Sequence, residues 1–582
     1  MENQEETNDE HQVSSSVSTR HSCLCRCFGY NKKSLCWIGF LFLIVVILTT
    51  TLTTRNNYSA SLNKDWVLVG ALTENSATFR IRTDTEGSQA KSLVVSLNNE
   101  EVITQEVSYN DYVDSIVVDG LDSNTRYEYQ TKTASGSAIT SGSFTTSPPA
   151  NARFNFSIAT AGCAWTASKE TVFSRIAELN PLLFIHLGDF HYLDINSQDV
   201  QTRIEAMDQV LSSPSQAELF TSTSIVSMWD DHDYLGNDSE GYEKGREAAL
   251  EGYTLGFPHY TPLPASLIGN TSTSFPVPPY HAFTIATVRF IISDLRSEST
   301  PASIYSDEQK NWLFDELRNA TAYDFVVWLT SKPWIGPVKE GDDSWSGHPN
   351  DRAELSQHIS EVVTGNNLLA ISSDAHMVAF DDGRNTYYGT NENASSFPIL
   401  QSGPLDRLGS TKGGPFSDGC YTVRYERNHQ FSTIDFVFPD NEDDESCMEI
   451  TSYRVSGDSR EVILTKRLCG EIFTPSIQAG TGSCDSTTLS GASIALVSVA
   501  GLLVVGSIAT AFWFFGRCEA LKVSTIVIVC FFLTLVAGIG IPLAMSVSQY
   551  DTTTILIVLL LQLIFTFIFI MIWALKVRAS KD

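Results

Sequence analysis

The sequence predicts a layered α/β domain preceded by an all-β sandwich, with apolar segments of membrane-spanning length near both ends of the chain. Three observations lead to this prediction. Short alternating runs separated by turn-prone residues fill residues 66–146, apolar strand-like runs alternate with amphipathic stretches after them, and the longest apolar runs lie near the termini. A chain of 582 residues is long enough for two folded domains besides such segments.

The composition excludes one class of partner. The 67 acidic residues outnumber the 38 basic ones, so the formal net charge is -29. A nucleic-acid-binding module needs clustered Lys and Arg, and we therefore expect none here. The acidity suits an extracellular surface or a site for multivalent cations, although solubility alone also explains it.

The apolar segments predict four transmembrane helices. Residues 35–54 follow a basic stretch and carry no cleavage site of small residues, which is typical of a signal anchor with a cytoplasmic tail at 1–34. Three further spans are expected at 489–515, 523–547 and 554–575. Basic residues follow the first and the last of these. The pattern thus predicts a multi-pass protein in a lipid bilayer, with both termini cytoplasmic and the region between the first two spans extracellular or lumenal.

Cysteine usage agrees with an oxidising exterior. Cys420, Cys447, Cys469 and Cys484 are even in number and predict two disulfides in one of three pairings. Asn-X-Ser/Thr sequons in the same region are compatible with a glycoprotein. Cys163 is left over. A buried core cysteine is the commoner case for such a residue, but the polar blocks described below favour a metal ligand.

Residues 66–147 are expected to form the β-sandwich. Seven alternating runs at short spacing are typical of an antiparallel immunoglobulin-like or fibronectin III-like sandwich. The segment GLDSNTRYEYQ at 120–130 is similar to the tyrosine corner of such domains, with Tyr127 as the corner residue. No catalytic constellation occurs here, so a structural spacer beside the active site is the interpretation.

Residues 151–475 are expected to form the layered α/β domain. Its strand-like runs end in polar blocks: HLGDFHYLD at 186–194, WDDHDYLGND at 229–238 and SSDAHM at 372–377. Cys163 follows another such run. In sheets of this kind the site lies beyond the strand ends. Carboxylates, histidine, tyrosine and a thiol fixed at strand ends are what a two-metal hydrolase needs.

These blocks, together with ISDLRS, DDSWSGHPNDR and KGGPFSDG, resemble the PhoD-type alkaline phosphatases of the calcineurin-like metallophosphoesterase superfamily. The resemblance extends over residues of about 66–430 and does not include the apolar segments. It implies an α/β four-layer metallophosphoesterase sandwich that hydrolyses phosphate esters at a centre of ferric iron and calcium.

The resemblance also implies a ligand set. Asp189 would bridge both metals. Ferric iron would be held by Cys163, Asp189, Tyr192 and His376, because thiolate and phenolate suit its charge. Calcium would be held by Asp189, Asp231 and Asp374, a set of oxygen ligands only.

Further residues are assigned from their chemistry. His232 and Asp189 are the expected catalytic residues, with His232 donating to the developing charge or the leaving oxygen. Arg296 and Arg352 are expected to bind substrate phosphate, with a structural salt bridge as the equal alternative. Four neighbours of these blocks are expected to support the ligands without binding metal: His186, His191, Asp230 and Asp233.

The sequence therefore predicts a membrane-anchored phosphatase. A phosphodiesterase acting on nucleotides or lipid head groups is the alternative within enzymes, because such a centre accepts either ester. A membrane sensor that only binds phosphate belongs to a different class. The last three spans lack the charged residues of a transport site, and all expected metal ligands are present, so we favour the enzyme.

Overall fold

The computed structural model describes residues 64–83, 90–107, 113–260, 279–339, 341–363, 367–390, 396–423, 426–441 and 445–469. All of them belong to one compact unit, Asn63–Asp582.

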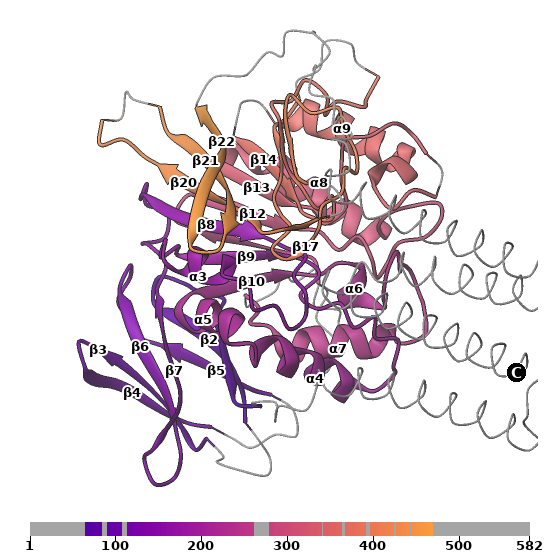
Figure 1. Cartoon of the computed structure of the whole chain (residues 1–582). Helices are drawn as coiled ribbons and strands as arrows, with labels where there is room; N and C mark the ends of the chain where they lie inside the picture. Colours follow the sequence, from indigo (N-terminus) through magenta and orange to yellow (C-terminus); the bar gives the residue numbers. More distant parts are fainter. Residues whose placement is uncertain are drawn as a thin grey trace, which may run out of the picture. The chain divides into compact units, whose positions relative to one another are not determined.

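Two large sheets dominate this unit. The first has nine strands in the order β22-β21-β20-β8-β9-β10-β1-β2-β5 (Figure 1). Its strands are β1 Trp66–Gly70, β2 Ser76–Arg82, β5 Asp114–Asp119, β8 Phe156–Ala161, β9 Leu183–Leu187, β10 Ser224–Met228, β20 Gln430–Val437, β21 Cys447–Ser456 and β22 Ser459–Cys469.

The second sheet has seven strands in the order β11-β12-β13-β14-β16-β15-β18. They are β11 His281–Ile285, β12 Val288–Ile292, β13 Phe325–Leu329, β14 Leu368–Ser372, β15 Val378–Asp381, β16 Ile399–Gln401 and β18 Asp418–Tyr421. Two smaller sheets pair β17 Arg407–Leu408 with β19 Arg427–Asn428, and order β3 Ser92–Leu97, β4 Glu100–Glu106, β6 Arg126–Lys132 and β7 Ala138–Thr145 as β4-β3-β6-β7.

The helices are short and amphipathic. They are α3 Val172–Ala177, α4 Val200–Leu211, α5 Pro214–Ser222, α6 Asp231–Tyr234, α7 Arg246–Gly256, α8 Asp307–Arg318 and α9 Pro349–Val362, with 3-10 turns at η1 Ala320–Ala322 and η2 Trp345–Gly347. Helix α8 is capped at its start, where the Ser306 side chain accepts a hydrogen bond from the Gln309 backbone N–H.

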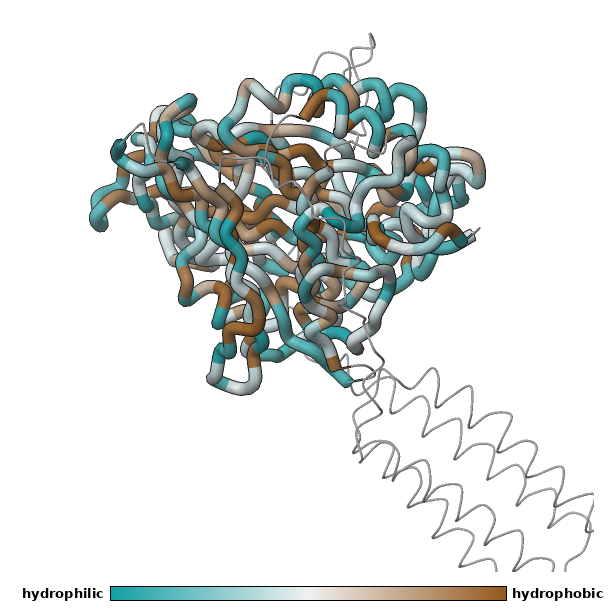
Figure 2. Tube along the Cα trace, turned by 90° about the horizontal axis from the view of Figure 1, so that it is seen from above, coloured by the Kyte–Doolittle hydropathy of each residue, from teal (hydrophilic) through white to brown (hydrophobic). Residues whose placement is uncertain are grey.

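Alternation along the strands builds the layers. On β9, Ile185 joins a core that also holds Phe290 of β12, whereas its neighbour Phe184 faces α4 and α5. A third core packs α8 and α9 against the outer face of β13. The order is thus helices, sheet, sheet, helices. Figure 2 shows hydrophobic residues along the inner strands and hydrophilic residues along outer turns.

Strand direction positions the site. In the first sheet β8, β9 and β10 are parallel neighbours, and in the second β12, β13 and β14 are parallel neighbours. The carboxyl ends of parallel strands lie on one edge of a sheet. The chain segments that leave these strands are therefore close together.

The seven expected strands before residue 147 are all present as β1 to β7. The Tyr127 hydroxyl accepts a hydrogen bond from the Asp122 backbone N–H at 2.9 Å, which is the contact expected of a tyrosine corner. One feature was not predicted. Strand β1 pairs in parallel with β10, with Gly70 opposite Ile225, so β1, β2 and β5 extend the first large sheet.

The prediction of four transmembrane helices is corrected by the structure. Among the described residues, no helix is long and apolar enough to cross a membrane. The longest, α9, has 14 residues, and this corresponds to about 21 Å against about 30 Å of hydrocarbon. The predicted spans 35–54, 489–515, 523–547 and 554–575 lie outside the described residues. The multi-pass membrane location, with the bilayer as a partner and cytoplasmic termini, is not supported.

The disulfide prediction is answered in part. Cys447 and Cys469 are bonded and join the paired ends of β21 and β22. Cys420 is also disulfide-bonded, and Cys484 lies outside the described residues. Cys163 is a free, buried cysteine.

Candidate metal centre

Three residues at the strand ends have an unusual backbone. Cys163 lies two residues after β8, Asp189 two after β9 and His376 four after β14, and their φ angles are 59°, 56° and 51°. This left-handed region is uncommon for residues other than glycine. Such conformations cluster at functional sites, where the surrounding structure holds them. The loops are held here by bonds such as that from the Cys163 N–H to the Gly188 carbonyl.

The first cluster joins the two sheets. Cys163, Asp189 and His376 each place a ligand atom within 4.8 Å of the others. Tyr192 belongs with them, since its hydroxyl donates to Asp189 Oδ2 at 2.6 Å and lies 3.3 Å from His376 Nε2. The structure thus brings together the four side chains that the sequence assigned to iron.

The His376 ring is oriented for a cation. Its Nδ1 lies 3.0 Å from the Leu408 carbonyl, which can only accept, so Nδ1 carries the proton and Nε2 keeps its lone pair. Burial, reinforced by Arg407, lowers the pKa of His376 to about 3. The imidazole is therefore neutral, as a metal ligand must be.

Burial disfavours the anionic forms of three side chains in this cluster. Burial raises the pKa values of Cys163, Asp189 and Tyr192 well above their ordinary values, and the negative charge on Asp189 adds to the effect for the other two. No Lys or Arg of the described residues forms an ion pair with Asp189. A bound cation would remove this penalty.

The second cluster contains Asp189, Asp231 and His232. His232 Nδ1 is hydrogen-bonded to Asp194 Oδ1. Burial opposes the charge on His232, but the nearby carboxylates, Asp189 foremost, outweigh it and raise its pKa to about 9. The imidazole is therefore protonated at neutral pH and its Nε2 is free to donate.

Asp374 is placed differently from the expectation. It was expected to share a calcium ion with Asp189 and Asp231, yet it belongs to none of the clusters found among the described residues. Both of its carboxylate oxygens accept hydrogen bonds from Lys412 Nζ, each at 2.9 Å. A side-chain ammonium thus sits where the sequence predicted an interaction with a metal.

The third cluster was not predicted. Asp231, Asp238 and Asp343 place carboxylate oxygens within 4.8 Å of one another. Arg296 is fully buried and holds this group together: it donates to Asp230 and, at 2.6 Å, to Asp343, and it lies 4.0 Å from Asp231. Arg296 is therefore at the site, where its present role is to orient carboxylates.

Arg352 is not brought to the clusters. Its Nη1 donates to the carbonyls of Trp334 and Gly336 at 3.0 and 2.9 Å, and its guanidinium stacks on the Tyr388 ring at 3.7 Å. Arg352 lies near the start of α9, and its side chain is buried. The structure gives it a structural role in place of the expected phosphate contact.

Of the four neighbours expected to support the ligands, Asp230 and Asp233 make supporting contacts. Asp233 accepts from the backbone N–H groups of Phe190 and Asp230, and closes a capping box on α6. Asp230 accepts from Arg296. His186 and His191 are buried beside the cluster and belong to none of the metal-ligand groups.

Sequence reasoning missed several charged residues at the site: Asp194, Asp238, Asp343, Arg407 and Lys412. Arg407 stacks on the Tyr192 ring at 3.7 Å. A signal was available for four of them. Asp194 and Asp238 end two of the polar blocks, Asp343 lies in the block DDSWSGHPNDR, and Lys412 begins the block KGGPFSDG. Nothing in the local pattern of Arg407 distinguishes it.

Comparisons with known proteins agree with this architecture. No family model matches the sequence, and no curated protein matches it significantly. The structure is similar to that of PhoD, with a TM-score of 0.52 and 18% identity over 72% of this chain and 95% of that chain. A purple acid phosphatase, PPD1 from yellow lupin (Lupinus luteus) seeds, matches with a TM-score of 0.47 and 12% identity over 74% of this chain and 77% of that chain. The expected likeness to PhoD is thus shown at the level of the fold.

Proposed function

We propose that this protein is a metal-dependent phosphoesterase that hydrolyses phosphate esters and releases inorganic phosphate, in the manner of PhoD-type alkaline phosphatases. The observation that carries the proposal is the convergence of Cys163, Asp189, Tyr192 and His376 from two sheets. The fold shared with PhoD supports it.

The donor set of the first cluster fits ferric iron. A thiolate and a phenolate are soft or oxidisable anions whose charge a trivalent cation compensates, and His376 presents a neutral nitrogen beside them. Asp189 is only 1% exposed and has no basic partner among the described Lys and Arg residues. A cation bound between these groups would use the donor set and would compensate the buried charge of Asp189.

The second position fits a hard cation such as calcium. Asp189 and Asp231 offer carboxylate oxygens, and Asp238 and Asp343 offer more beside Asp231. Asp374 stays in the proposed ligand set, although its present partner is Lys412. When bound, the two cations supply charge neutralisation for the phosphate and an activated water.

The protein's own side chains have separate tasks. His232 holds a proton at Nε2 because Asp194 binds Nδ1, and it donates that proton to the leaving oxygen. Arg296 fixes the carboxylates of Asp230 and Asp343. Arg407 lies over Tyr192 and stabilises the phenolate.

The test uses the full-length protein with a monoester and a diester of 4-nitrophenol. Chelator is expected to abolish hydrolysis, and calcium is expected to restore it better than zinc, because the second position is rich in oxygen. Asp189→Asn should lower kcat by about a hundredfold or more. The matched control is Asp199→Asn, which changes an N-cap residue remote from the clusters and retains a capping side chain.

Two results would contradict the proposal. One is a folded, metal-supplied protein that hydrolyses neither ester. The other is an Asp189→Asn variant as active as the wild type. The ratio of monoester to diester activity decides between a phosphatase and the phosphodiesterase alternative.

A further inference from the structure

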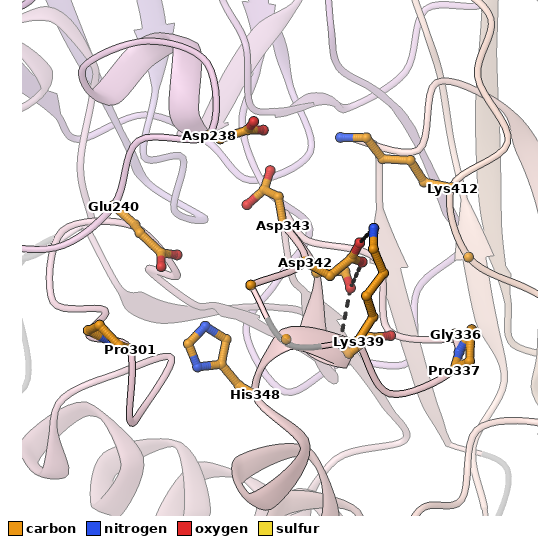
Figure 3. Close-up of a pocket in the computed structure, with 15 residues that line it drawn as sticks. Asp238, Glu240, Pro301, Gly336, Pro337, Lys339, Asp342, Asp343, His348 and Lys412 are labelled. Carbon is orange, nitrogen blue, oxygen red and sulfur yellow. Dashed lines mark hydrogen bonds and ion pairs between the residues drawn. The ribbon is translucent and has the colours of Figure 1, made fainter.

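A pocket of about 830 Å³ opens beside the carboxylates of the third cluster. Asp238 and Asp343 line it on one side and Lys412 lines it next to them, and these side chains point toward the same space (Figure 3). An ester whose phosphate lies at the clusters would therefore place its alcohol portion in this pocket. The chemistry of the lining selects that alcohol.

The lining offers little surface for stacking, because the imidazole of His348 is the one aromatic ring among its described residues. Among the described residues that line the pocket there is no Phe, Tyr, Trp, Leu, Ile, Val or Met, and the apolar side chains are those of Pro301 and Pro337. Binding of a nucleobase, an aryl group or an acyl chain rests on aromatic or aliphatic contact. The pocket therefore offers such apolar groups few favourable contacts.

The lining is rich in hydrogen-bond acceptors that are held in place. Glu240 accepts from Lys332 Nζ, and Asp343 accepts from Arg296 and lies 3.1 Å from Lys332. Lys332 is fully buried, so these carboxylates are fixed from behind and their charge is compensated. Carboxylates in this state keep lone pairs for hydroxyl donors, and the compensation reduces their attraction for a free cation.

His348 adds a polar group with an unsatisfied atom. The residue is 8% exposed, it lines the pocket below Glu240 and Asp343, and its buried Nδ1 has no hydrogen-bond partner. Buried polar atoms without partners are rare in folded proteins. The Nδ1 atom is itself shielded from the pocket, so the imidazole would meet a substrate hydroxyl through its pocket-facing ring edge.

The charges of the lining disfavour a second anionic group. Four carboxylates line the pocket, Asp238, Glu240, Asp342 and Asp343, against the two ammonium groups of Lys339 and Lys412. Lys339 is itself paired with Asp342, and Lys412 with Asp374. A second phosphate group would therefore find no unpaired ammonium group in this lining.

We propose that this pocket binds the alcohol portion of the substrate and that it favours phosphate esters of uncharged alcohols with several hydroxyl groups, such as sugar phosphates, with Glu240 and His348 as the residues that determine specificity. This inference rests on the proposed phosphoesterase function and names the substrate class for it.

The test compares two monoesters of equal charge, glucose 6-phosphate and phenyl phosphate, with the full-length protein. The measured quantity is the ratio of kcat/KM for the first ester to kcat/KM for the second. Glu240→Gln and His348→Phe are each expected to lower this ratio by about tenfold, because a site built for a hydroxyl loses discrimination when its partner is removed. A purely structural role would lower both kcat/KM values together.

The two variants are chosen to fold. In Glu240→Gln the buried Lys332 still has Asp343 at 3.1 Å, and in His348→Phe the Nδ1 atom removed has no partner to lose. Glu354→Gln is the matched control: Glu354 is also paired with a lysine, Lys310, but lies on the exposed side of α9, away from the pocket. It should leave the ratio unchanged.

The outcomes separate the two proposals. If the wild type hydrolyses both esters and the ratio is unchanged in Glu240→Gln and His348→Phe, the substrate class is wrong while the phosphoesterase function stands. If the metal-supplied wild type hydrolyses neither ester, the proposed function itself is wrong. A tenfold lower ratio in both variants, with the control unchanged, supports the inference.

Discussion

Lys412 Nζ lies 2.9 Å from both carboxylate oxygens of Asp374. A metal ion at the proposed second position would therefore compete with this ammonium for one carboxylate. Lys412 comes from a glycine-containing loop whose Ser410 is bonded to the Ala375 carbonyl, so this loop is attached to the chain segment that carries Asp374. At the proposed second cation position, the charge of Lys412 is therefore expected to lower the affinity for a divalent cation.

Lys412→Met is accordingly expected to tighten calcium binding. A partly exposed ion pair of this kind is worth about 1 kcal/mol, which corresponds to about a fivefold lower Kd. Equilibrium dialysis with calcium measures the effect. Lys339→Met is the matched control, because Lys339 is also paired with an aspartate but is more exposed and does not contact Asp374. Weaker calcium binding in Lys412→Met would show that the lysine supports the cation site.

The iron side is expected to give a visible absorption band. Thiolate and phenolate ligands of ferric iron are easily oxidised donors, and charge transfer from them colours the protein. Cys163→Ser should shift or bleach the band and lower turnover, since the variant replaces an anionic sulfur ligand. Absorption spectra and metal analysis of the purified protein measure both effects. A colourless wild type that holds zinc would contradict iron, and a fully active Cys163→Ser variant would remove Cys163 from the ligand set.

Two buried histidines away from the clusters predict a loss of stability in acid. Burial lowers the pKa of His259 to about 3 and that of His281 to about 4. The unfolded chain takes up protons near pH 6.5 and the folded chain does not, so stability is lost as pH falls below about 6.5. Each histidine should cost the wild type about 2 kcal/mol between pH 7.5 and pH 5.

The measurement is the free energy of unfolding in denaturant at both pH values, for the wild type and for His281→Gln. The wild type should lose about 2 kcal/mol more than the variant, because glutamine does not titrate. The same difference at both pH values would show that His281 takes up a proton in the folded state.

Gly70 is expected to tolerate no side chain. A Cβ atom there would lie 2.3 Å from the Ile225 backbone oxygen and 3.1 Å from Pro258 Cβ. Since the nearest atom is backbone, β1 or β10 must move, and Gly70→Ala should cost about 1–3 kcal/mol of unfolding free energy. Ser115→Ala on the exposed face of β5 is the control. Equal stability of Gly70→Ala and the wild type would show that the two strands separate easily.

The sequence predicted local structure well. The strands between residues 66 and 146 and the polar blocks after strands were read from alternation and from turn-prone residues, which act over a few positions. The pairing of β1 with β10 joins Gly70 to Ile225, and no local pattern contains that information. The orientation of Arg352 was missed for a similar reason, because its partners at Trp334 and Gly336 belong to a loop before α9.

The same limit explains the second cation position. The family resemblance implied that Asp231 and Asp374 would share a cation, but it did not indicate that Lys412 would reach Asp374 from a loop 38 residues away. The four residues assigned to iron converge from strand-end segments of the two sheets. Residues that approach from long loops, such as Asp343 and Lys412, depend on how those loops fold.

The pairing of Gly70 with Ile225 also indicates which residues the folded domain needs. A chain that lacks residues 1–147 would keep every residue of the clusters, yet β10 would lose β1, one of its two neighbouring strands, and that edge of the sheet would be exposed. Strand β10 leads directly to Asp231 and His232. Strand β1 thus supports the strand that leads to the site, and its removal would expose an unpaired sheet edge, which is prone to aggregation, next to Asp231 and His232.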